Sequence, residues 1–161
     1  MAEYYRVRLS REDLVFSAGH FVTFQSGDCE RLHGHNYRVA AEVCGPLGED
    51  HYVVDFRVLR EILGTILAEL DHRMLVPTEH PRIQVSADER EILVRFEDRR
   101  WVFPRGDCLL LAVPNTTAEM LARYIGHRLL DALAGRGVRL AAARIEIEES
   151  SGQSAAWETT E

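Results

Sequence analysis

The sequence predicts an α+β fold in which strands and helices form a single domain spanning residues 1–161. Two long segments in the N-terminal third alternate apolar and polar side chains, which is the pattern of strands. Two later segments repeat apolar side chains every three or four residues, which is the pattern of amphipathic helices. The chain of 161 residues is long enough for one substantial core and too short for two comfortable domains.

The N-terminal segments predict a hairpin of two long strands. Residues 4–9 and 14–24 form the first strand region and residues 32–44 the second, with Gly45 and Pro46 as its end. The connecting residues 25–31 contain Ser26-Gly27-Asp28 and predict a turn or loop that carries Cys29. The apolar positions on which the first strand region depends are Tyr5, Val7, Leu9, Leu14, Phe16 and Ala18.

Two helices and a final strand follow from periodicity and end signals. The first helix is predicted from about Phe56 to Leu70, with Asp55 as its N-cap. The second is predicted to begin at Thr116, because Thr116 and Glu119 have the spacing of a capping box, and to end at Gly135 and Gly137. Residues 138–149 alternate as a strand does, and Trp157 lies on a short tail that either packs or frays.

The segment of residues 76–115 between the helices is predicted to be an inserted hairpin or small flap. It contains three short strand candidates, the first two joined by a turn at residues 97–99. A connection of this length often serves binding or assembly, and a surface decoration is an equal alternative. The strand candidates are Glu91 to Phe96, Trp101 to Phe103 and Cys108 to Val113.

Composition and charge exclude several classes of protein. No apolar run approaches the ~20 residues of a membrane-spanning helix, so we expect no membrane partner. The first six residues lack the pattern of a signal peptide, and three cysteines without close pairing fit a reducing compartment. We therefore expect a cytoplasmic protein. The net charge of −7 argues against a general nucleic-acid surface, which requires a basic patch.

Three histidines predict a metal site. His33 and His35 alternate on one strand, so their side chains share a face. His20 is the nearest third ligand, because a turn between residues 20 and 33 would bring its strand back beside the pair. Three neutral imidazoles leave the fourth position of a tetrahedral zinc ion open, which is typical of a catalytic site.

Two further motifs have alternative interpretations. Cys29 precedes His33 by four residues and would either close the zinc site as a fourth ligand or act as a thiolate base near the metal. Spacing alone does not decide between these roles. Asp71 and His72 follow the first helix, where they would form a proton relay or a solvated helix cap.

Taken together, these motifs resemble the 6-pyruvoyl-tetrahydropterin synthase and 6-carboxytetrahydropterin synthase family. The resemblance covers about residues 4–75 and 108–157. It implies the tunnelling fold, or T-fold: an antiparallel four-stranded sheet with two helices on one face, assembled into a homohexamer with active sites between subunits. The motifs are Phe-Ser-Ala-Gly-His20, Cys29-x-x-x-His33-Gly-His35, Val-Asp55-Phe, Leu-Asp71-His72, Thr116-Thr117-x-Glu119 and the strand ending at Glu149.

The resemblance also implies roles for single residues. The three histidines would bind Zn²⁺, which would grip the side-chain hydroxyls of 7,8-dihydroneopterin triphosphate. Cys29 would be the general base, with Asp71 and His72 as a relay supplied across a subunit boundary. Glu149 would accept hydrogen bonds from the pterin. Thr116 and Thr117 would line the pterin pocket, and Glu119 is expected to cap the helix.

Glu30 leaves the identity of the reaction product undecided. A branch of the family has Glu in place of Cys29 and forms 6-hydroxymethyl-dihydropterin for folate synthesis, and this chain has both residues in tandem. Glu30 is therefore a second candidate base or a solvated loop carboxylate. Our first choice of product is 6-carboxytetrahydropterin for 7-deazaguanine (queuosine) synthesis. The alternatives are a pyruvoyl or folate-type product, or a non-catalytic pterin or purine binder.

Overall fold

A six-stranded sheet is the largest element of the computed structural model, which describes residues 3–160. The residues outside this description are Met1, Ala2 and Glu161. They include both ends of the predicted domain and the first two residues of the N-terminal segment that lacks a signal-peptide pattern. The strands run in the order β7-β3-β1-β2-β8-β9. Their bounds are β1 Tyr5–His20, β2 His33–Gly45, β3 Arg73–Pro77, β7 Cys108–Leu111, β8 Ala142–Ser150 and β9 Gln153–Thr160.

The predicted four-stranded antiparallel sheet is present within these six strands. Strands β1, β2, β8 and β9 are successive antiparallel neighbours. Strands β3 and β7 add to the β1 side in parallel, an extension that the sequence did not predict. Both are short. Strand β3 is buried except at Arg73, whereas β7 is mostly half-buried with Leu110 exposed, so neither shows the regular alternation of a half-exposed strand.

Strand β1 joins the two segments that the sequence separated. It is one strand with an irregularity between Ser10 and Val15, where its register against β2 shifts. The apolar positions change from odd to even numbers there, so Leu9 and Phe16 both reach the buried face. The shift also places His20 on that face.

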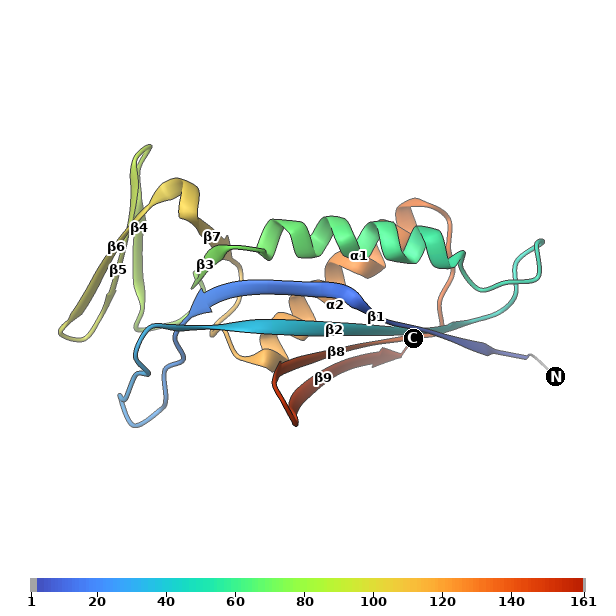
Figure 1. Ribbon diagram of the computed structural model, residues 1–161, viewed down its shortest axis with the longest axis horizontal. Coiled ribbons are helices and arrows are strands. Elements are labelled where there is room, and N and C mark those ends of the chain that lie inside the picture. Colours follow the sequence, from blue (N-terminus) through green and yellow to red (C-terminus); the bar gives the residue numbers. More distant parts are fainter. Residues whose placement is uncertain (1–2, 161) are drawn as a thin grey trace.

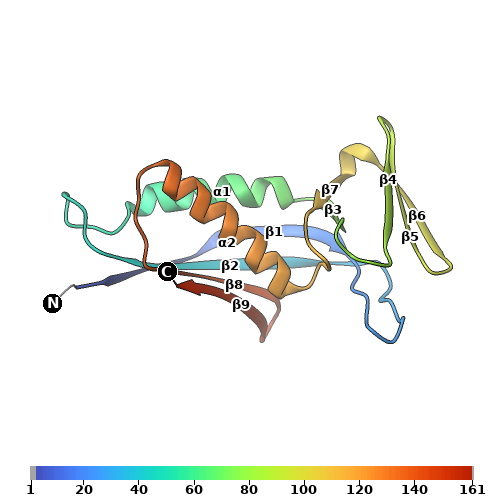
Figure 2. The same cartoon turned by 180° about the vertical axis from the view of Figure 1, so that it is seen from behind.

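Helices α1 (Phe56–Leu70) and α2 (Ala118–Gly135) cover the same face of the main sheet (Figures 1 and 2). The bounds of α1 and its Asp55 cap, which accepts a hydrogen bond from the Arg57 amide, confirm the prediction. The predicted capping box of α2 is wrong. Thr117 is the N-cap and accepts from the Met120 amide, because the Thr116 hydroxyl donates instead to the Phe21 carbonyl.

The C-terminal strands explain a glycine inside α2. Trp157 does not fray: it lies on β9, opposite Ile145 of β8, and packs against the main core. A Cβ atom on Gly126 would lie 2.2 Å from Cζ3 of Trp157. Glycine therefore lets the helix approach the indole ring closely.

A second sheet stands at one end of the molecule (Figure 1). We call it the small sheet: β4 (Gln84–Ala87), β5 (Glu91–Phe96) and β6 (Arg99–Pro104), in that order and antiparallel. The predicted hairpin of β5 and β6 is confirmed, β4 was missed, and the third predicted strand belongs to the main sheet as β7. A short 3-10 turn, Arg105–Asp107, leads into β7.

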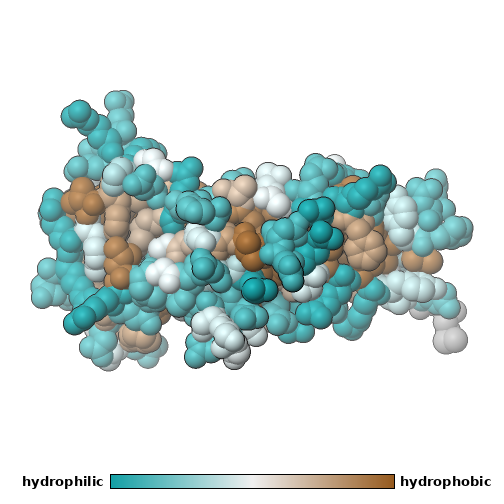
Figure 3. All heavy atoms as spheres, viewed as in Figure 1, coloured by the Kyte–Doolittle hydropathy of each residue, from teal (hydrophilic) through white to brown (hydrophobic). Residues whose placement is uncertain are grey.

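The small sheet has its own hydrophobic cluster. One face of β5, with Ile92, Val94 and Phe96, is buried. Trp101 and Phe103 of β6 pack there too, together with Phe21 at the end of β1. The surface seen in Figure 3 is largely hydrophilic, with apolar side chains scattered over the small sheet and the middle of the molecule. Within residues 3–160, no helix has the combined length and apolar character needed to cross a bilayer.

Candidate metal centre and pocket

Three histidine rings converge at one end of the main sheet. His20 ends β1, while His33 and His35 begin β2, with His20 directly opposite His33 in the register. Each offers one ring nitrogen, and these three atoms lie within 4.8 Å of one another. His20 is fully buried and His33 is exposed, so the cluster faces outward from the core. The predicted meeting of the three imidazoles is confirmed.

Backbone carbonyls fix the tautomers of two rings. His20 Nδ1 lies 2.8 Å from the Thr116 carbonyl oxygen, and His33 Nδ1 lies 2.7 Å from that of Arg31. A carbonyl only accepts, so both Nδ1 atoms carry hydrogen and both Nε2 atoms present lone pairs. His33 Nε2 faces His35 Nε2 at 3.0 Å. Lone pairs oriented in this way fit a divalent cation with nitrogen ligands, such as zinc.

Burial favours the metal-binding form of His20. Removal from water lowers the pKa of His20, although the bond to the Thr116 carbonyl and the charge of Glu149 oppose the change. The neutral ring is the form that ligates a metal.

A pocket of about 600 Å³ opens beside the triad. Its lining includes His33 and His35 and three carboxylates, those of Glu30, Glu119 and Glu149. Glu149 Oε1 lies 3.5 Å from His20 Nε2 and 3.6 Å from His35 Nε2. The volume is in the range of small-ligand sites, and the carboxylates make the pocket a hydrogen-bond acceptor for a donor-rich ligand.

The carboxylate of Glu30 is held at the pocket. Its Oε2 accepts a hydrogen bond from the Val22 amide at 3.2 Å and lies 3.8 Å from His33 Nε2. The backbone of Glu30 also donates to the Val22 carbonyl at 2.9 Å. The carboxylate of Glu30 therefore lies beside the triad, with its side chain partly exposed to solvent.

Cys29 faces a different neighbourhood. Its half-buried side chain packs against the hydrophobic cluster of the small sheet, and Cys29 is absent from the lining of the pocket. Burial raises the pKa of the thiol, with Glu30 adding to the effect and Arg99 opposing it. Among the described residues, the metal-ligand cluster contains the three histidines and no sulfur.

Asp71 and His72 form a pair at the end of α1. The Oδ2 atom of Asp71 and the Nδ1 atom of His72 lie 2.8 Å apart. The Ser17 amide donates to Asp71 Oδ1 at 2.7 Å, and this bond, more than His72, lowers the pKa of Asp71. His72 has φ 56°, a strained conformation for a residue other than glycine. Its side chain lines a second hollow that also borders His33 and His35.

The two threonines have separate roles. Thr117 lines the pocket beside the histidines. Thr116 departs from the prediction: it is fully buried, its hydroxyl donates to the Phe21 carbonyl, and its own carbonyl supports His20. Glu119 lines the pocket and does not cap the helix.

Tyr37 is a site residue that sequence reasoning missed. It is fully buried on the histidine face of β2, with its hydroxyl 3.4 Å from both ring nitrogens of His20. Burial raises the pKa of Tyr37 far above its ordinary value, and Glu149 adds to the effect. The period-2 pattern placed Tyr37 on this face, but it looked like any core aromatic residue.

Comparison with known proteins identifies the family. The chain matches the sequence profile of the 6-pyruvoyl tetrahydropterin synthase family over residues 8–160. The chain belongs to this family. A Methanocaldococcus jannaschii protein, named provisionally as a 6-carboxy-5,6,7,8-tetrahydropterin synthase, is 32% identical over 146 residues, 89% of each chain. The Haemophilus influenzae protein named 6-carboxy-5,6,7,8-tetrahydropterin synthase is 28% identical over 127 residues, 76% of this chain and 81% of its own.

Solved structures share the fold. The 6-pyruvoyl tetrahydropterin synthase of Plasmodium falciparum superposes with a TM-score of 0.89 at 27% identity, over 98% of each chain. That of Plasmodium vivax, solved with a catalytic glutamate replaced by alanine, has a TM-score of 0.89 at 23% identity, over 98% of this chain and 99% of its own. The T-fold prediction is confirmed, and family membership indicates an enzyme of the tetrahydropterin synthase type.

Proposed function

We propose that the protein is a zinc-dependent lyase that converts 7,8-dihydroneopterin triphosphate to 6-carboxy-5,6,7,8-tetrahydropterin, for 7-deazaguanine (queuosine) synthesis. The observation that carries the proposal is the convergence of the three imidazoles at the edge of a pocket that contains Glu149. The names of the Methanocaldococcus and Haemophilus relatives support this choice of product.

His20, His33 and His35 would hold the zinc ion through nitrogen atoms. When bound, zinc would supply Lewis acidity toward hydroxyl groups on the substrate side chain. The carbonyls of Thr116 and Arg31 would keep two of the ligands in the correct tautomer and orientation.

Glu149 would anchor the pterin ring. A carboxylate accepts two hydrogen bonds from adjacent N–H groups, and the amino and ring N–H groups of a pterin present such an edge. Thr117 would line the same pocket. Among the described residues, the pocket lining contains three carboxylates and no arginine. This negative charge suits the N–H donors of the pterin and would repel the triphosphate. We therefore place the triphosphate outside the pocket.

Cys29 would accept the proton from the substrate side chain, with Asp71 and His72 as its relay. Among the described residues, Asp71 and His72 pair with each other and the Cys29 thiol donates to the Glu30 carbonyl, with no hydrogen bond or ion pair between the two groups. This arrangement is consistent with a relay supplied by a neighbouring copy. We therefore propose a homohexamer with active sites between subunits, acting in the cytoplasm on a small molecule, without a nucleic-acid or membrane partner. The whole chain would form one domain in each subunit.

A specific observation favours a second candidate function. Glu30, and not Cys29, lines the pocket and approaches His33 Nε2. As the proton acceptor, Glu30 would direct the reaction to cleavage of the side chain and a 6-hydroxymethyl-dihydropterin product, as in the folate-type branch. A glutamate is also the catalytic residue named for the Plasmodium vivax protein.

Product analysis separates these functions. Purified protein is incubated with zinc and 7,8-dihydroneopterin triphosphate, and the products are identified by mass. We expect 6-carboxytetrahydropterin with acetaldehyde and triphosphate, and loss of these products in Cys29→Ala with the metal retained. A 6-hydroxymethyl product that disappears in Glu30→Gln would support the second candidate. A pyruvoyl product would change the assignment within the family. No turnover together with pterin binding would support a non-catalytic binder and overturn both proposals.

A further inference from the structure

The small sheet contacts the loop that carries Cys29 and Glu30. We call residues 21–32, between β1 and β2, the Cys29 loop. At the start of the loop, the ring of Phe21 stacks on that of Trp101 in β6, with centroids 4.4 Å apart and an interplanar angle of 14°. The stack joins the loop to the hydrophobic cluster of the small sheet, so the two cannot move independently without exposing apolar surface.

Arg99 contacts the Cys29 loop at Cys29 and Glu30. Arg99 begins β6, and its Nη1 donates to the Glu30 carbonyl oxygen at 3.1 Å. The guanidinium also opposes the rise in the pKa of the Cys29 thiol, through charge and a hydrogen bond. One cation from the small sheet is therefore placed beside the Cys29 thiol and against the backbone of Glu30. Glu30 is the other charged group near the thiol.

His80 holds the opposite side of the loop. The amides of Arg82 and Ile83 donate to its Nδ1 at 3.0 and 3.1 Å, so Nε2 carries the hydrogen and donates to the Thr23 hydroxyl at 2.9 Å. Thr23 is buried and pairs with Cys29 across the loop. The ring of His80 also contacts that of Phe96, with centroids 5.9 Å apart.

Asn115 completes the attachment from the side of α2. Its side-chain amide donates to the Thr23 carbonyl at 3.0 Å, and its Oδ1 accepts from the Thr116 amide at 3.1 Å. Thr116 also supports His20. The loop is thus tied on one side to the metal-ligand framework and on the other to the small sheet.

We propose that the small sheet is a positioning element of the active site, in which Arg99 and His80 set where Cys29 and Glu30 stand relative to the histidine triad. The inference rests on the proposed function for its catalytic consequence. Its structural part, the placement of the loop and the environment of the thiol, stands apart from the identity of the product.

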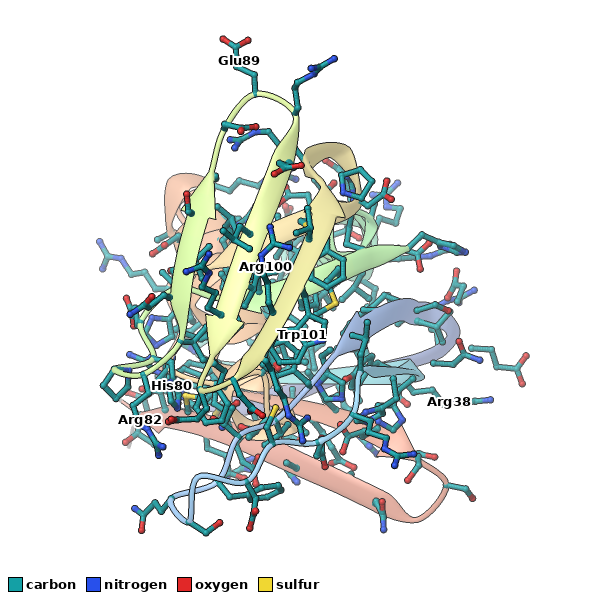
Figure 4. All side chains as sticks on the ribbon, turned by 90° about the vertical axis from the view of Figure 1, so that its left-hand side faces the viewer. Arg38, His80, Arg82, Glu89, Arg100 and Trp101 are labelled. Atoms are coloured by element: carbon teal, nitrogen blue, oxygen red, sulfur yellow. The ribbon has the colours of Figure 1, made fainter. Side chains whose placement is uncertain are left out.

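Arg99 and Arg100 provide a matched pair for the test. They are adjacent on β6, but their side chains lie on opposite faces of the small sheet; Figure 4 shows Arg100 on the outer face, away from the loop. The rate of Cys29 alkylation by iodoacetamide is followed by peptide mass spectrometry from pH 6 to 10, in full-length protein. We expect Arg99→Gln to raise the midpoint of this profile by about half a pH unit, the scale of an exposed charge pair.

The controls make this result decisive. Arg100→Gln should keep the wild-type midpoint, and Arg99→Lys should largely restore it because it retains the charge. If Arg99→Gln and Arg100→Gln behave alike, or if neither moves the midpoint, Arg99 does not act on Cys29 and the inference fails for this residue.

Thr23 and His80 are tested by hydrogen exchange. Thr23→Val removes the hydroxyl while keeping the shape of the side chain, and Thr23→Ser keeps the hydroxyl. His80→Asn retains an acceptor for the two amides but loses the bond to Thr23. We expect faster exchange of the Cys29 loop in Thr23→Val and His80→Asn, with wild-type exchange in Thr23→Ser and in both helices. Unchanged loop exchange in both variants would overturn the role of His80.

Turnover adds the link to catalysis. With 7,8-dihydroneopterin triphosphate, Arg99→Gln and His80→Asn should lower kcat by about tenfold or more with little change in KM, because a small misplacement of a reacting group is costly. An unaltered kcat would contradict the catalytic part of the inference. If wild-type protein forms no product, the proposed function fails, whereas alkylation and hydrogen exchange still decide whether the small sheet positions the loop.

Discussion

The main sheet and the small sheet contribute to the candidate site in different ways. The three histidines stand on two long neighbouring strands whose inner face is covered by both helices. Cys29 and Glu30 stand on a loop whose position depends on side chains of the small sheet. The comparison teaches that the candidate metal ligands stand on the main sheet, whereas the candidate proton acceptors stand on a loop held by a separate, smaller core.

The largest effect that tests this division is on metal binding. His20→Ala removes a fully buried ligand from the main sheet, and we expect zinc affinity to fall by at least about 100-fold, more than the loss of an outer-shell partner. His80→Ala removes a histidine of the other region and should leave zinc affinity unchanged. Zinc content after gel filtration checks both. Equal loss of zinc in the two variants would contradict the separate roles of the main sheet and the small sheet.

The next effect concerns close packing on the main sheet. Gly126→Ala places a methyl group 2.2 Å from Trp157, and we expect the free energy of unfolding to fall by about 1–3 kcal/mol because of overpacking. Gly64→Ala in α1 meets no atom within 4 Å and should raise that free energy by about 0.5–1 kcal/mol. Urea denaturation measures both. A destabilised Gly64→Ala would contradict this interpretation.

The two cores are then compared by equal truncations. Ile66 of α1 and Ile92 of β5 are both buried, in the main cluster and the small-sheet cluster respectively. Each change to Val should cost about 1 kcal/mol. We expect Ile92→Val to weaken amide protection in β4–β6 and the Cys29 loop alone, and Ile66→Val to weaken it throughout the main sheet. Identical exchange patterns would mean that the molecule has a single cooperative core.

The smallest effect is the ion pair that joins the helices of the main sheet. Arg128 donates two hydrogen bonds to Glu69, and these bonds lower the pKa of Glu69. The stabilisation is therefore complete above the pKa of an unperturbed glutamate, roughly 4.3, and is lost as the pH falls through the lower folded-state value. Because both groups are exposed, Glu69→Gln should cost less than about 1 kcal/mol at pH 7 and nothing near pH 2. Thermal unfolding of wild type and Glu69→Gln at the two pH values measures this loss of stability. The same loss at both pH values would contradict the prediction.

The sequence predicted the part of the site that depends on local periodicity. His33 and His35 share a face because strands repeat every two residues, and His20 joins them through a short hairpin. The boundaries of α1 follow from apolar spacing in the same way, whereas the register shift in β1 was not predicted, because residues 4–9 and 14–24 were expected as separate strand segments. The T-fold itself was implied by the resemblance to the family and not by periodicity.

The rest depends on contacts between segments far apart in the chain. The loop with Cys29 and Glu30 is held by a hydrogen bond from Arg99 to the Glu30 carbonyl, and Arg99 lies 69 positions after Glu30. The Thr116 hydroxyl donates to the Phe21 carbonyl and Thr117 caps the helix, although only Thr116 has a glutamate three residues later. Strands β3 and β4 were missed because one is wholly buried and the other mostly exposed, so neither alternates strongly.

X-ray absorption at the zinc edge of the zinc-loaded protein tests the central claim most directly. The account predicts three imidazole nitrogens and one oxygen ligand such as water around the metal, with no sulfur scatterer, and the same spectrum in Cys29→Ala. A sulfur shell at about 2.3 Å that vanishes in Cys29→Ala would show a closed site with the thiol as fourth ligand, and would contradict the account.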